Sequence, residues 1–456
     1  MRQIEEQQAW SSRLVFLMAA VGAAVGLGNL WRFPYTAGVS GGAAFVIVYL
    51  GAVVLVAIPI VMGELLIGRR GRMSPPGSFQ KLAASASASP AWRWLGILNV
   101  TAVFIILSFY SVIAGWALAY VPKIATGVFT GASGEQVNAI YNALLASPVK
   151  LALWHGIFIL VTLFIVAKGL QGGIERAVKF LMPALFFMLI LLVIYAGVAG
   201  DMAKALDFLF QADFSKITSG VVLDAVGQAF FSVSVAMAIL ITYGSYLSKD
   251  VSIPGAAVII AGADTLVALL AGLAIFPLVF ANGLDPAAGP GLIFVTLPLA
   301  FGGMPGGALF GTMFFLLFIV SALTSSIAVM EPIVAWADEH RGMRRSVTTP
   351  IVGLLAWLLG LTTVFSFNIW SDVYPLAAFE TFAQVNLFGL QEYLAVNIML
   401  PLGGLLIAVF IGWVMPRTDS TDELGMGDSV LYRTWRFLVR YVCPVAVAGI
   451  LLSNWL

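Results

Sequence analysis

The segment GAAVGLGNLWRFP, residues 22–34, interrupts an apolar run of helix length with three glycines and the amide side chain of Asn29. In lipid an unpaired backbone group costs several kcal/mol, so an interrupted helix is tolerated only where it lines a cavity enclosed by protein. A break at this point would offer free carbonyl oxygens to a cation and free N–H groups to an anion. The segment therefore predicts a binding site at mid-membrane depth.

A second interruption lies in residues 227–246, GQAFFSVSVAMAILITYGSY, where small polar residues fall in the middle of an apolar run. When about 20 apolar residues are counted for each membrane span, the two interrupted runs are the first and the sixth helices. This spacing is the one that two inverted five-helix repeats require. We therefore expect both helices to be broken at a shared site.

The composition is that of a polytopic membrane protein, with 61% hydrophobic and 10% charged residues and a mean hydropathy of +1.01. The net charge of +1 implies no nucleic-acid partner. Cys443 is the single cysteine, and His155 and His340 are too far apart in the chain to suggest a haem or metal pair. The first apolar run is long and carries the broken motif, so it is not expected to be a cleaved signal.

We expect an all-α protein with eleven transmembrane helices in one domain that covers residues 1–456. Helices one to five occupy about 12–198, helices six to ten about 221–415, and an extra helix eleven about 433–455. The individual limits are about 12–38, 43–68, 92–122, 149–167, 174–198, 221–247, 253–281, 306–337, 347–367, 388–415 and 433–455.

The loop charges predict the orientation. With the N-terminus inside, most lysines and arginines fall in cytoplasmic segments, and Arg32 lies within the first span. The outside receives only Lys123, Lys150, Lys204 and Lys216. An odd number of spans then places the C-terminus outside.

Two carboxylates fall inside predicted spans. Asp264, within IIAGADTLVALLAG, is costly at that depth unless it meets a cation or a proton, so a functional role is expected. The alternative is a neutral acid that is hydrogen-bonded to a neighbouring helix. Glu64 lies nearer the inner end of helix two, where it either braces the freed backbone at the breaks or reaches the membrane surface.

Hydroxyl groups gather in the run SALTSSIAVMEP, residues 321–332. Such groups usually bond back to their own helix, but beside a broken first helix they become candidate ligands for a small hard cation. Tyr110, in the third span, could likewise be only an interhelical hydrogen bonder. Gly173 and Pro183 frame a stretch at the start of helix five that either unwinds locally or is merely kinked.

Four motifs, GLGNLWRFP, GQAFFSVS, LTSSIA and SFYSVIAGW, resemble those of the neurotransmitter:sodium symporter family, which includes the bacterial leucine and tryptophan transporters. The resemblance covers nearly the whole chain. It implies a multi-pass protein of the bacterial cytoplasmic membrane that needs the lipid bilayer and works as a monomer. The implied partners are sodium ions and an amino-acid substrate.

The resemblance also implies two sodium sites and a substrate site. The first sodium site is expected at Ala24, Asn29, Ser232 and Asp264, together with the substrate carboxylate. The second sodium site is expected at Gly22, Val25, Ser321, Thr324 and Ser325. The substrate is expected to contact Ala24, Gly26, Gly28, Ile106, Tyr110, Phe231, Ser232, Ser234, Val235, Met237, Ser325 and Val329.

Gates above and below the site are implied as well. The outer gate would combine Phe231 with an ion pair between Arg32 and an acid in helix ten, for which Glu392 is the best match. The inner gate would use Trp10 and an acid of helix eight, Glu339 or its neighbour Asp338. The family places an arginine three residues before that tryptophan. Here that residue is Gln7, so the acid needs another partner, such as Arg2.

We therefore expect sodium-coupled symport of an amino acid by alternating access and no enzymatic activity. The alternatives are a proton-coupled transporter in which Asp264 carries the proton and, less favoured, a channel or scaffold. Because Asp264 supplies a fixed negative charge near Tyr49, Gln228 and Ser232, no chloride requirement is expected. Gly26 leaves room for the substrate's own carboxylate. The apolar lining favours neutral, apolar amino acids of aliphatic size, with aromatic ones as the runner-up.

Overall fold

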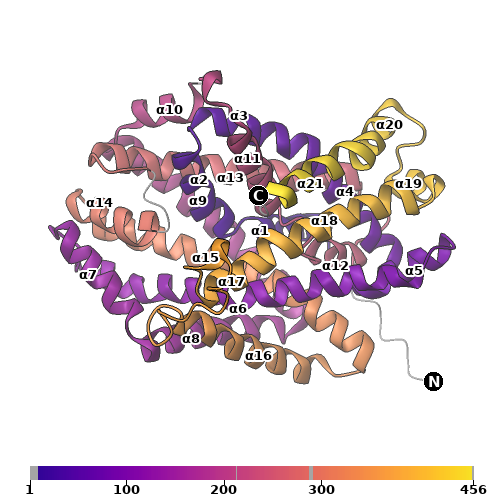
Figure 1. The fold of residues 1–456 in the computed structure, drawn as a ribbon, viewed down its shortest axis with the longest axis horizontal. Helices are drawn as coiled ribbons and strands as arrows, with labels where there is room; N and C mark the ends of the chain where they lie inside the picture. The colour runs from indigo at the N-terminus through magenta and orange to yellow at the C-terminus, as the bar shows by residue number, and fades with distance from the viewer. Residues whose placement is uncertain (1–8, 212, 287–290, 454–456) are drawn as a thin grey trace.

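The computed structural model describes residues 9–211, 213–286 and 291–453, and every regular element within these ranges is a helix. Figure 1 shows these helices packed side by side in one bundle. Within these described ranges, nine helical stretches are long and apolar enough to cross a membrane. They are α3–α4 (Ala43–Gly71), α6 with its preceding turn (Pro90–Ala125), α8 (Pro148–Val166), η4–α9 (Leu170–Ala199), α13 (Ile253–Ala281), α15 (Gly307–Arg341), α16 (Arg345–Phe365), α17–α18 with the turns η8 and η9 (Leu387–Val414), and α20–α21 (Val430–Ser453).

The first predicted span consists of α1 (Arg13–Ala24), the wide turn η1 (Gly28–Arg32) and α2 (Phe33–Val39), and it bends by 48° at the break. Counting it as one span gives ten in the described part of the chain. The sixth predicted span consists of α11 (Ser219–Ser232) and α12 (Ile239–Ser245), each too short to cross a bilayer by itself. The total of eleven and the inverted repeat therefore stay predictions.

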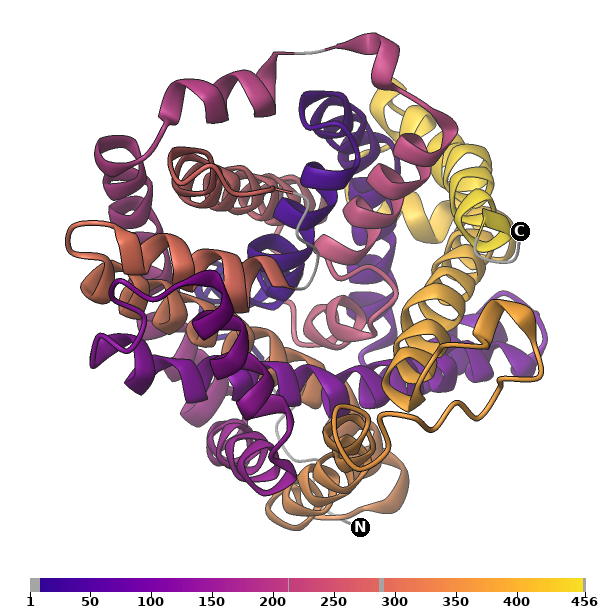
Figure 2. The same ribbon diagram turned by 60° about the vertical axis from the view of Figure 1, so that its left-hand side comes forward.

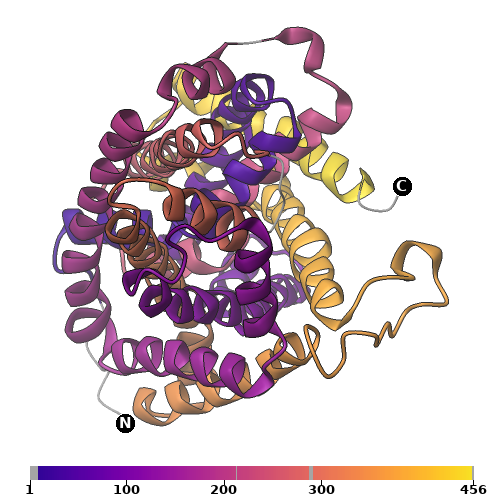
Figure 3. The ribbon, with the colours of Figure 1, turned by 90° about the vertical axis from the view of Figure 1, so that its left-hand side faces the viewer.

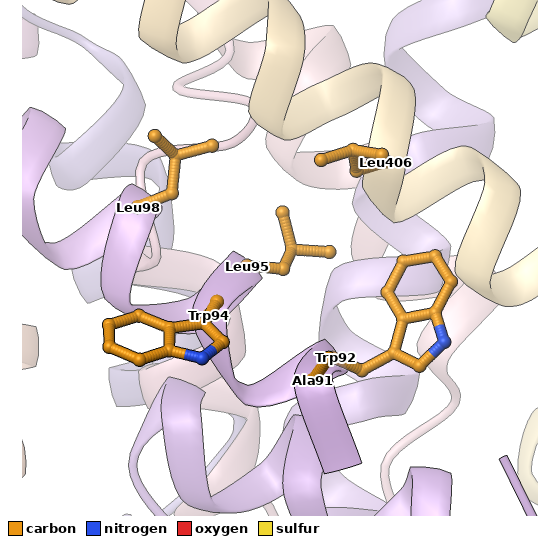
Figure 4. Close-up of a pocket in the computed structure, with 6 residues that line it drawn as sticks. All are labelled: Ala91, Trp92, Trp94, Leu95, Leu98 and Leu406. Atoms are coloured by element: carbon orange, nitrogen blue, oxygen red, sulfur yellow. The ribbon is translucent and has the colours of Figure 1, made fainter. Parts of the chain in front are cut away.

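Shorter helices connect the spans. These are α5 (Pro75–Ser85), α7 (Gly134–Leu145), α10 (Met202–Phe210), α14 (Leu297–Gly303) and α19 (Arg417–Leu424). The segment between α16 and α17 extends away from the bundle, as Figure 3 shows. Large apolar side chains such as Phe164 and Phe180 are exposed on α8 and α9, as expected where helices face lipid. An apolar cavity of about 430 Å³ has a lining that includes Leu95 and Leu98 of α6 and Leu406 of α18. Figure 4 shows these side chains around the cavity.

The two breaks lie in the middle of the bundle, where α1 and α12 pass among the other helices (Figure 2). Between α11 and α12 the backbone takes left-handed φ angles at Ser234 (60°), Ala236 (63°) and Ala238 (61°). The left-handed conformation costs a residue other than glycine roughly 1–2 kcal/mol, so neighbouring contacts must hold the segment in place. Glu64 provides one of them, because its Oε1 accepts a hydrogen bond of 2.9 Å from the Ala236 N–H. Glu64 is fully buried, which rules out the surface alternative.

One end of the bundle carries the arginine-rich segments. There Arg72, which ends α4, donates to the Ser245 carbonyl of α12, and Arg69 and Arg70 pair with acids of α19. Arg345, at the start of α16, lies at this same end beside the last turns of α12 and α15. This is the end that the loop charges predict to be cytoplasmic.

Candidate functional site

Asn29, Ser232 and Asp264 meet in the centre of the bundle, although they lie on three different helical segments. The Asn29 amide nitrogen lies 2.7 Å from Asp264 Oδ1, 3.0 Å from the Asp264 carbonyl and 3.1 Å from Ser232 Oγ. Ser232 donates to Asp264 Oδ2 at 2.5 Å. All three side chains are buried. The chain thus gathers a carboxylate, a hydroxyl and an amide around one point, where the amide nitrogen faces Asp264 and the amide oxygen accepts from the Gly26 N–H.

Asp264 has no cationic partner in the described part of the chain, because no lysine, arginine or histidine nitrogen lies within 4.0 Å of it. Tyr49 is close enough to interact with this carboxylate electrostatically. Gln228 donates to the Gly28 carbonyl at 2.8 Å, while its own carbonyl oxygen has no hydrogen-bonding partner among the described residues. A buried carboxylate in this position needs a bound cation or a proton to be tolerated.

A second oxygen cluster forms where the end of α1 meets α15. Ser325 Oγ lies 3.2 to 3.4 Å from three carbonyl oxygens, those of Gly22, Ala23 and Val25. Ser321 Oγ reaches the Val25 carbonyl at 3.2 Å, and Thr324 Oγ1 donates to the Ser321 carbonyl at 2.9 Å.

A serine hydroxyl has one proton to donate, so Ser325 cannot satisfy the three carbonyls around it together. The Val25 carbonyl is approached by both Ser321 and Ser325, at the end of α1 where the helix breaks. Such a cluster of carbonyl and hydroxyl oxygens fits a small cation, and no carboxylate is needed there when the charge is single. Neither cluster contains three His, Cys, Asp or Glu side chains, so transition-metal binding is not indicated in the described chain.

The backbone between the two clusters is buried and closely packed against side chains of other helices. Tyr110 Oη accepts from the Leu27 N–H at 3.3 Å. A Cβ atom on Gly26 would lie 2.6 Å from Ser325 Oγ and 3.0 Å from Tyr110 Oη. A Cβ on Gly28 would lie 3.2 Å from the Phe231 ring. Glycine at both positions therefore lets the broken backbone lie directly against Ser325, Tyr110 and Phe231.

The remaining predicted substrate residues are buried on the surrounding helices. Ser234 Oγ donates to the Ala23 carbonyl at 3.2 Å, so the two breaks touch directly, and Ala24 is the last residue of α1. The apolar members are Ile106 on α6, Val329 on α15, and Val235 and Met237 within the second break. None of these residues carries a charge.

The outer closure differs from the expected ion pair. The guanidinium of Arg32 lies 4.7 Å from the centre of the Phe231 ring, which lies against Gly28 at the first break. Glu392, at the end of α17, interacts with Arg32 electrostatically but does not come within 4.0 Å of it. Asp224 acts on Arg32 as well, and it accepts a 2.7 Å hydrogen bond from Ser40. Sequence reasoning missed Asp224, although it lies seven residues before Phe231 and so shares its helix face.

The inner closure also has unexpected partners. Trp10 Nε1 donates to the Tyr243 carbonyl at 3.0 Å, which fastens the chain before α1 beneath α12. Glu339 accepts from the Ser74 N–H at 2.6 Å and lies 3.9 Å from the imidazole of His340. Arg2 and Gln7 lie outside the described residues.

A buried ion pair that the sequence did not suggest lies beside Trp10. Glu331 of α15 is fully buried and pairs with both terminal nitrogens of Arg345, while its Oε1 also accepts from Tyr246 Oη at 2.9 Å. Glu175 provides a second fastening, because it accepts from the Ser11 N–H at 2.8 Å and from Ser11 Oγ at 2.5 Å.

Glu175 ends the wide turn η4 (Leu170–Glu175), which precedes α9 (Arg176–Ala199). The stretch between Gly173 and Pro183 is helical in this structure, with the proline inside α9. Local unwinding of this stretch therefore stays a prediction for another conformation.

Interrupted membrane helices that enclose two oxygen clusters define a transporter with a central binding site. A family model described as the sodium:neurotransmitter symporter family matches residues 7–143 and 145–455, and the chain belongs to this family.

Related proteins, one of them with a solved structure, are similar to this chain along nearly its whole length. A crystal structure of MhsT in complex with L-phenylalanine is 42% identical, covers 99% of this chain and 100% of its own, and superposes with a TM-score of 0.90. An uncharacterized sodium-dependent transporter of Bacillus subtilis is 36% identical over 447 residues, which is 97% of each chain. A similar protein of Haemophilus influenzae is 33% identical over 457 residues, covering 99% of this chain and 98% of the relative.

Proposed function

We propose that this protein is a sodium-coupled symporter that carries a neutral, apolar α-amino acid into the cell by alternating access. The observation that carries the proposal is that Asn29 binds the backbone N–H of Gly26 at the first break and also the buried Asp264 and Ser232 side chains. Sodium would supply the positive charge that Asp264 lacks. The membership of the chain in a sodium symporter family supports the same cation.

Two sodium sites follow from the two oxygen clusters. The cluster around Asn29 and Asp264, with Ala24 and Ser232, would bind the first ion together with the substrate carboxylate. The cluster of Gly22, Val25, Ser321, Thr324 and Ser325 would bind the second. A carboxylate shared between substrate and ion makes each raise the affinity for the other, which is the thermodynamic basis of coupling.

The substrate would place its carboxylate against Gly26, Gly28 and Tyr110 and its amino group near the carbonyls of Phe231, Ser232 and Ser234. A charged side chain would be desolvated without a partner among the apolar residues around it, at a cost of several kcal/mol. The L-phenylalanine bound to MhsT supports an apolar substrate. It also supports aromatic amino acids as substrates alongside aliphatic ones.

Alternating access would use the two closures in turn. Phe231 and Arg32, with Asp224 and Glu392, would open toward the outside, and Trp10 with the Glu331–Arg345 pair would open toward the cytoplasm. Loosening of the stretch between Gly173 and Pro183 would release the second sodium inward. The arginine-rich end would face the cytoplasm, with the N-terminus inside.

Two further features belong to the proposal. The fixed charge of Asp264 makes chloride unnecessary, because a bound anion would be repelled. A single chain contains both clusters and both closures, so a monomer suffices. The competing candidate is proton-coupled transport, which is favoured only by the absence of a cationic partner for Asp264 among the described residues.

Binding to the purified protein tests the proposal. Thermal unfolding is measured with a panel of L-amino acids, in sodium chloride and in choline chloride. Leucine or phenylalanine should raise the midpoint in sodium and leave it unchanged in choline, while lysine and glutamate should have no effect in either. Stabilisation by lysine or glutamate, or equal stabilisation without sodium, would overturn the assignment.

A further inference from the structure

A basic pocket lies at the start of the last span, far from the central site. It is a cavity of about 270 Å³ between α19 and α20–α21, lined by Arg417, Tyr432, Arg433, Arg436, Phe437, Arg440 and Tyr441. These residues belong to the first turns of a membrane-crossing helix and to the short helix that precedes it. The pocket is therefore located where a helix leaves the bilayer.

Two of its four arginines have no carboxylate partner. Arg417 and Arg433 both pair with Asp428. In the described part of the chain no carboxylate lies within 4.0 Å of Arg436 or Arg440. Two acids of α19, Asp419 and Glu423, pair instead with arginines of α4.

The two unpaired arginines are fixed in position. Arg436 donates to Ser420 Oγ and Tyr432 Oη, each at 3.3 Å. Arg440 lies 4.0 Å above the Trp413 ring, and its buried Nε has no hydrogen-bonding partner among the described residues. Both residues line the same pocket, Arg436 from α20 and Arg440 from the wide turn η10 (Leu438–Val442). Two such groups form a site for one phosphate, which binds arginine through paired hydrogen bonds.

Aromatic rings flank the pocket on the lipid side. Trp413 is 54% exposed, Phe437 56% and Tyr441 47%, in a protein whose exposed apolar side chains face the bilayer. Tryptophan and tyrosine are enriched at the level of lipid headgroups, and basic pockets at the cytoplasmic ends of helices bind anionic headgroups. A soluble anion would not need these rings, whereas acyl chains would pack against them.

We propose that Arg436 and Arg440 bind the phosphate of an anionic phospholipid, whose acyl chains lie against Trp413, Phe437 and Tyr441. The site is independent of the substrate and sodium sites. The lipid would fasten α20 to the bundle, where Trp435 already donates to the Pro59 carbonyl of α4 at 3.1 Å.

Native mass spectrometry of the full chain in a neutral detergent tests the proposal. Phosphatidylglycerol and phosphatidylcholine are titrated separately, and inorganic phosphate serves as the soluble competitor. Each arginine is expected to contribute roughly a fivefold factor, so Arg436→Gln/Arg440→Gln should weaken phosphatidylglycerol binding by about 20-fold. Arg176→Gln/Lys249→Gln removes the same charge from exposed positions outside the pocket and should bind like the wild type.

Equal affinity for the two lipids, or unchanged phosphatidylglycerol binding in the pocket variant, overturns the proposal. Displacement of phosphatidylglycerol by millimolar phosphate also overturns it, in favour of a soluble anion. If the double variant does not fold, each single glutamine variant should lose about fivefold, and full affinity in both singles contradicts the assignment. Arg436→Lys/Arg440→Lys should retain the preference for the anionic lipid, because the charge remains.

Discussion

The amide nitrogen of Asn29 lies 2.7 Å from Asp264 Oδ1, although the two residues are 235 positions apart in the chain. This contact joins the break in the first span to the buried carboxylate of α13. The side-chain oxygen Oδ1 of Asn29 meanwhile accepts from the Gly26 N–H at 3.0 Å, which holds the broken backbone in place. One side chain thus links the geometry of the break to the charge that a cation would neutralise.

Removing a single oxygen ligand should weaken sodium binding and leave the fold intact. We expect Asn29→Ala and Thr324→Ala each to raise the sodium concentration for half-maximal substrate binding by about tenfold, because each deletes a polar contact to a charged group. Ser326→Ala is the matched control, since the Ser326 hydroxyl is buried in the same run without a hydrogen-bonding partner among the described residues. Normal sodium dependence in both ligand variants would refute the site assignment.

Neutralising Asp264 should create a chloride requirement. In Asp264→Asn the first sodium would lack a fixed counter-charge, and an anion near Tyr49, Gln228 and Ser232 could replace it. Uptake by this variant should be at least about fivefold faster in chloride than in gluconate. Wild-type uptake should be equal in the two salts. Strong inhibition of the wild type by gluconate would contradict the role given to Asp264.

Adding one methyl group at Gly26 should block the substrate carboxylate. The new Cβ would lie 2.6 Å from Ser325 Oγ and 3.0 Å from Tyr110 Oη, so it would fill the space that the carboxylate needs. We expect Gly26→Ala to weaken binding of radiolabelled leucine or phenylalanine by about tenfold or more. Gly51→Ala is the control, because no atom lies within 4 Å of its added Cβ. Equal affinity in the two variants would exclude Gly26 from the substrate site.

The break in the first span was predictable because interrupted apolar spans have few stable explanations. Glycines and Asn29 inside a lipid-spanning run require a protein-lined cavity, and α13 (Ile253–Ala281) has the limits that its apolar run predicts. The Glu331–Arg345 pair was not predictable, because the sequence pattern places Arg345 in a charged loop. Only the packing of α16 against α15 brings it to Glu331. Asp224 was missed for a similar reason, since its relation to Arg32 depends on how α11 lies beside η1.

Breaking the buried inner ion pair should favour opening toward the cytoplasm. Glu331→Gln leaves Arg345 without its counter-charge in a closed interface, which destabilises the closed state. In a Cys443→Ser background, Ser245→Cys reports how accessible the inner end of α12 is to a reagent in water. Ser245 is only 4% exposed in this structure, so opening should expose it. Its modification by a thiol reagent should become about tenfold faster with Glu331→Gln.

The exposed pair Lys216–Asp213 provides the control for this measurement. These side chains are 60% and 51% exposed and lie 3.9 Å apart, so Asp213→Asn should not change the labelling rate. An equal rate with and without Glu331→Gln would show that the pair does not hold the inner side closed.

Uptake into proteoliposomes tests sodium coupling most directly. The purified protein is reconstituted, and accumulation of radiolabelled leucine or phenylalanine is followed under an inward sodium gradient, and separately under an inward proton gradient without sodium. We expect the sodium gradient to drive accumulation of the amino acid above its equilibrium level. The proton gradient should give only the background uptake of protein-free liposomes. Accumulation driven by the proton gradient in the absence of sodium would contradict sodium coupling.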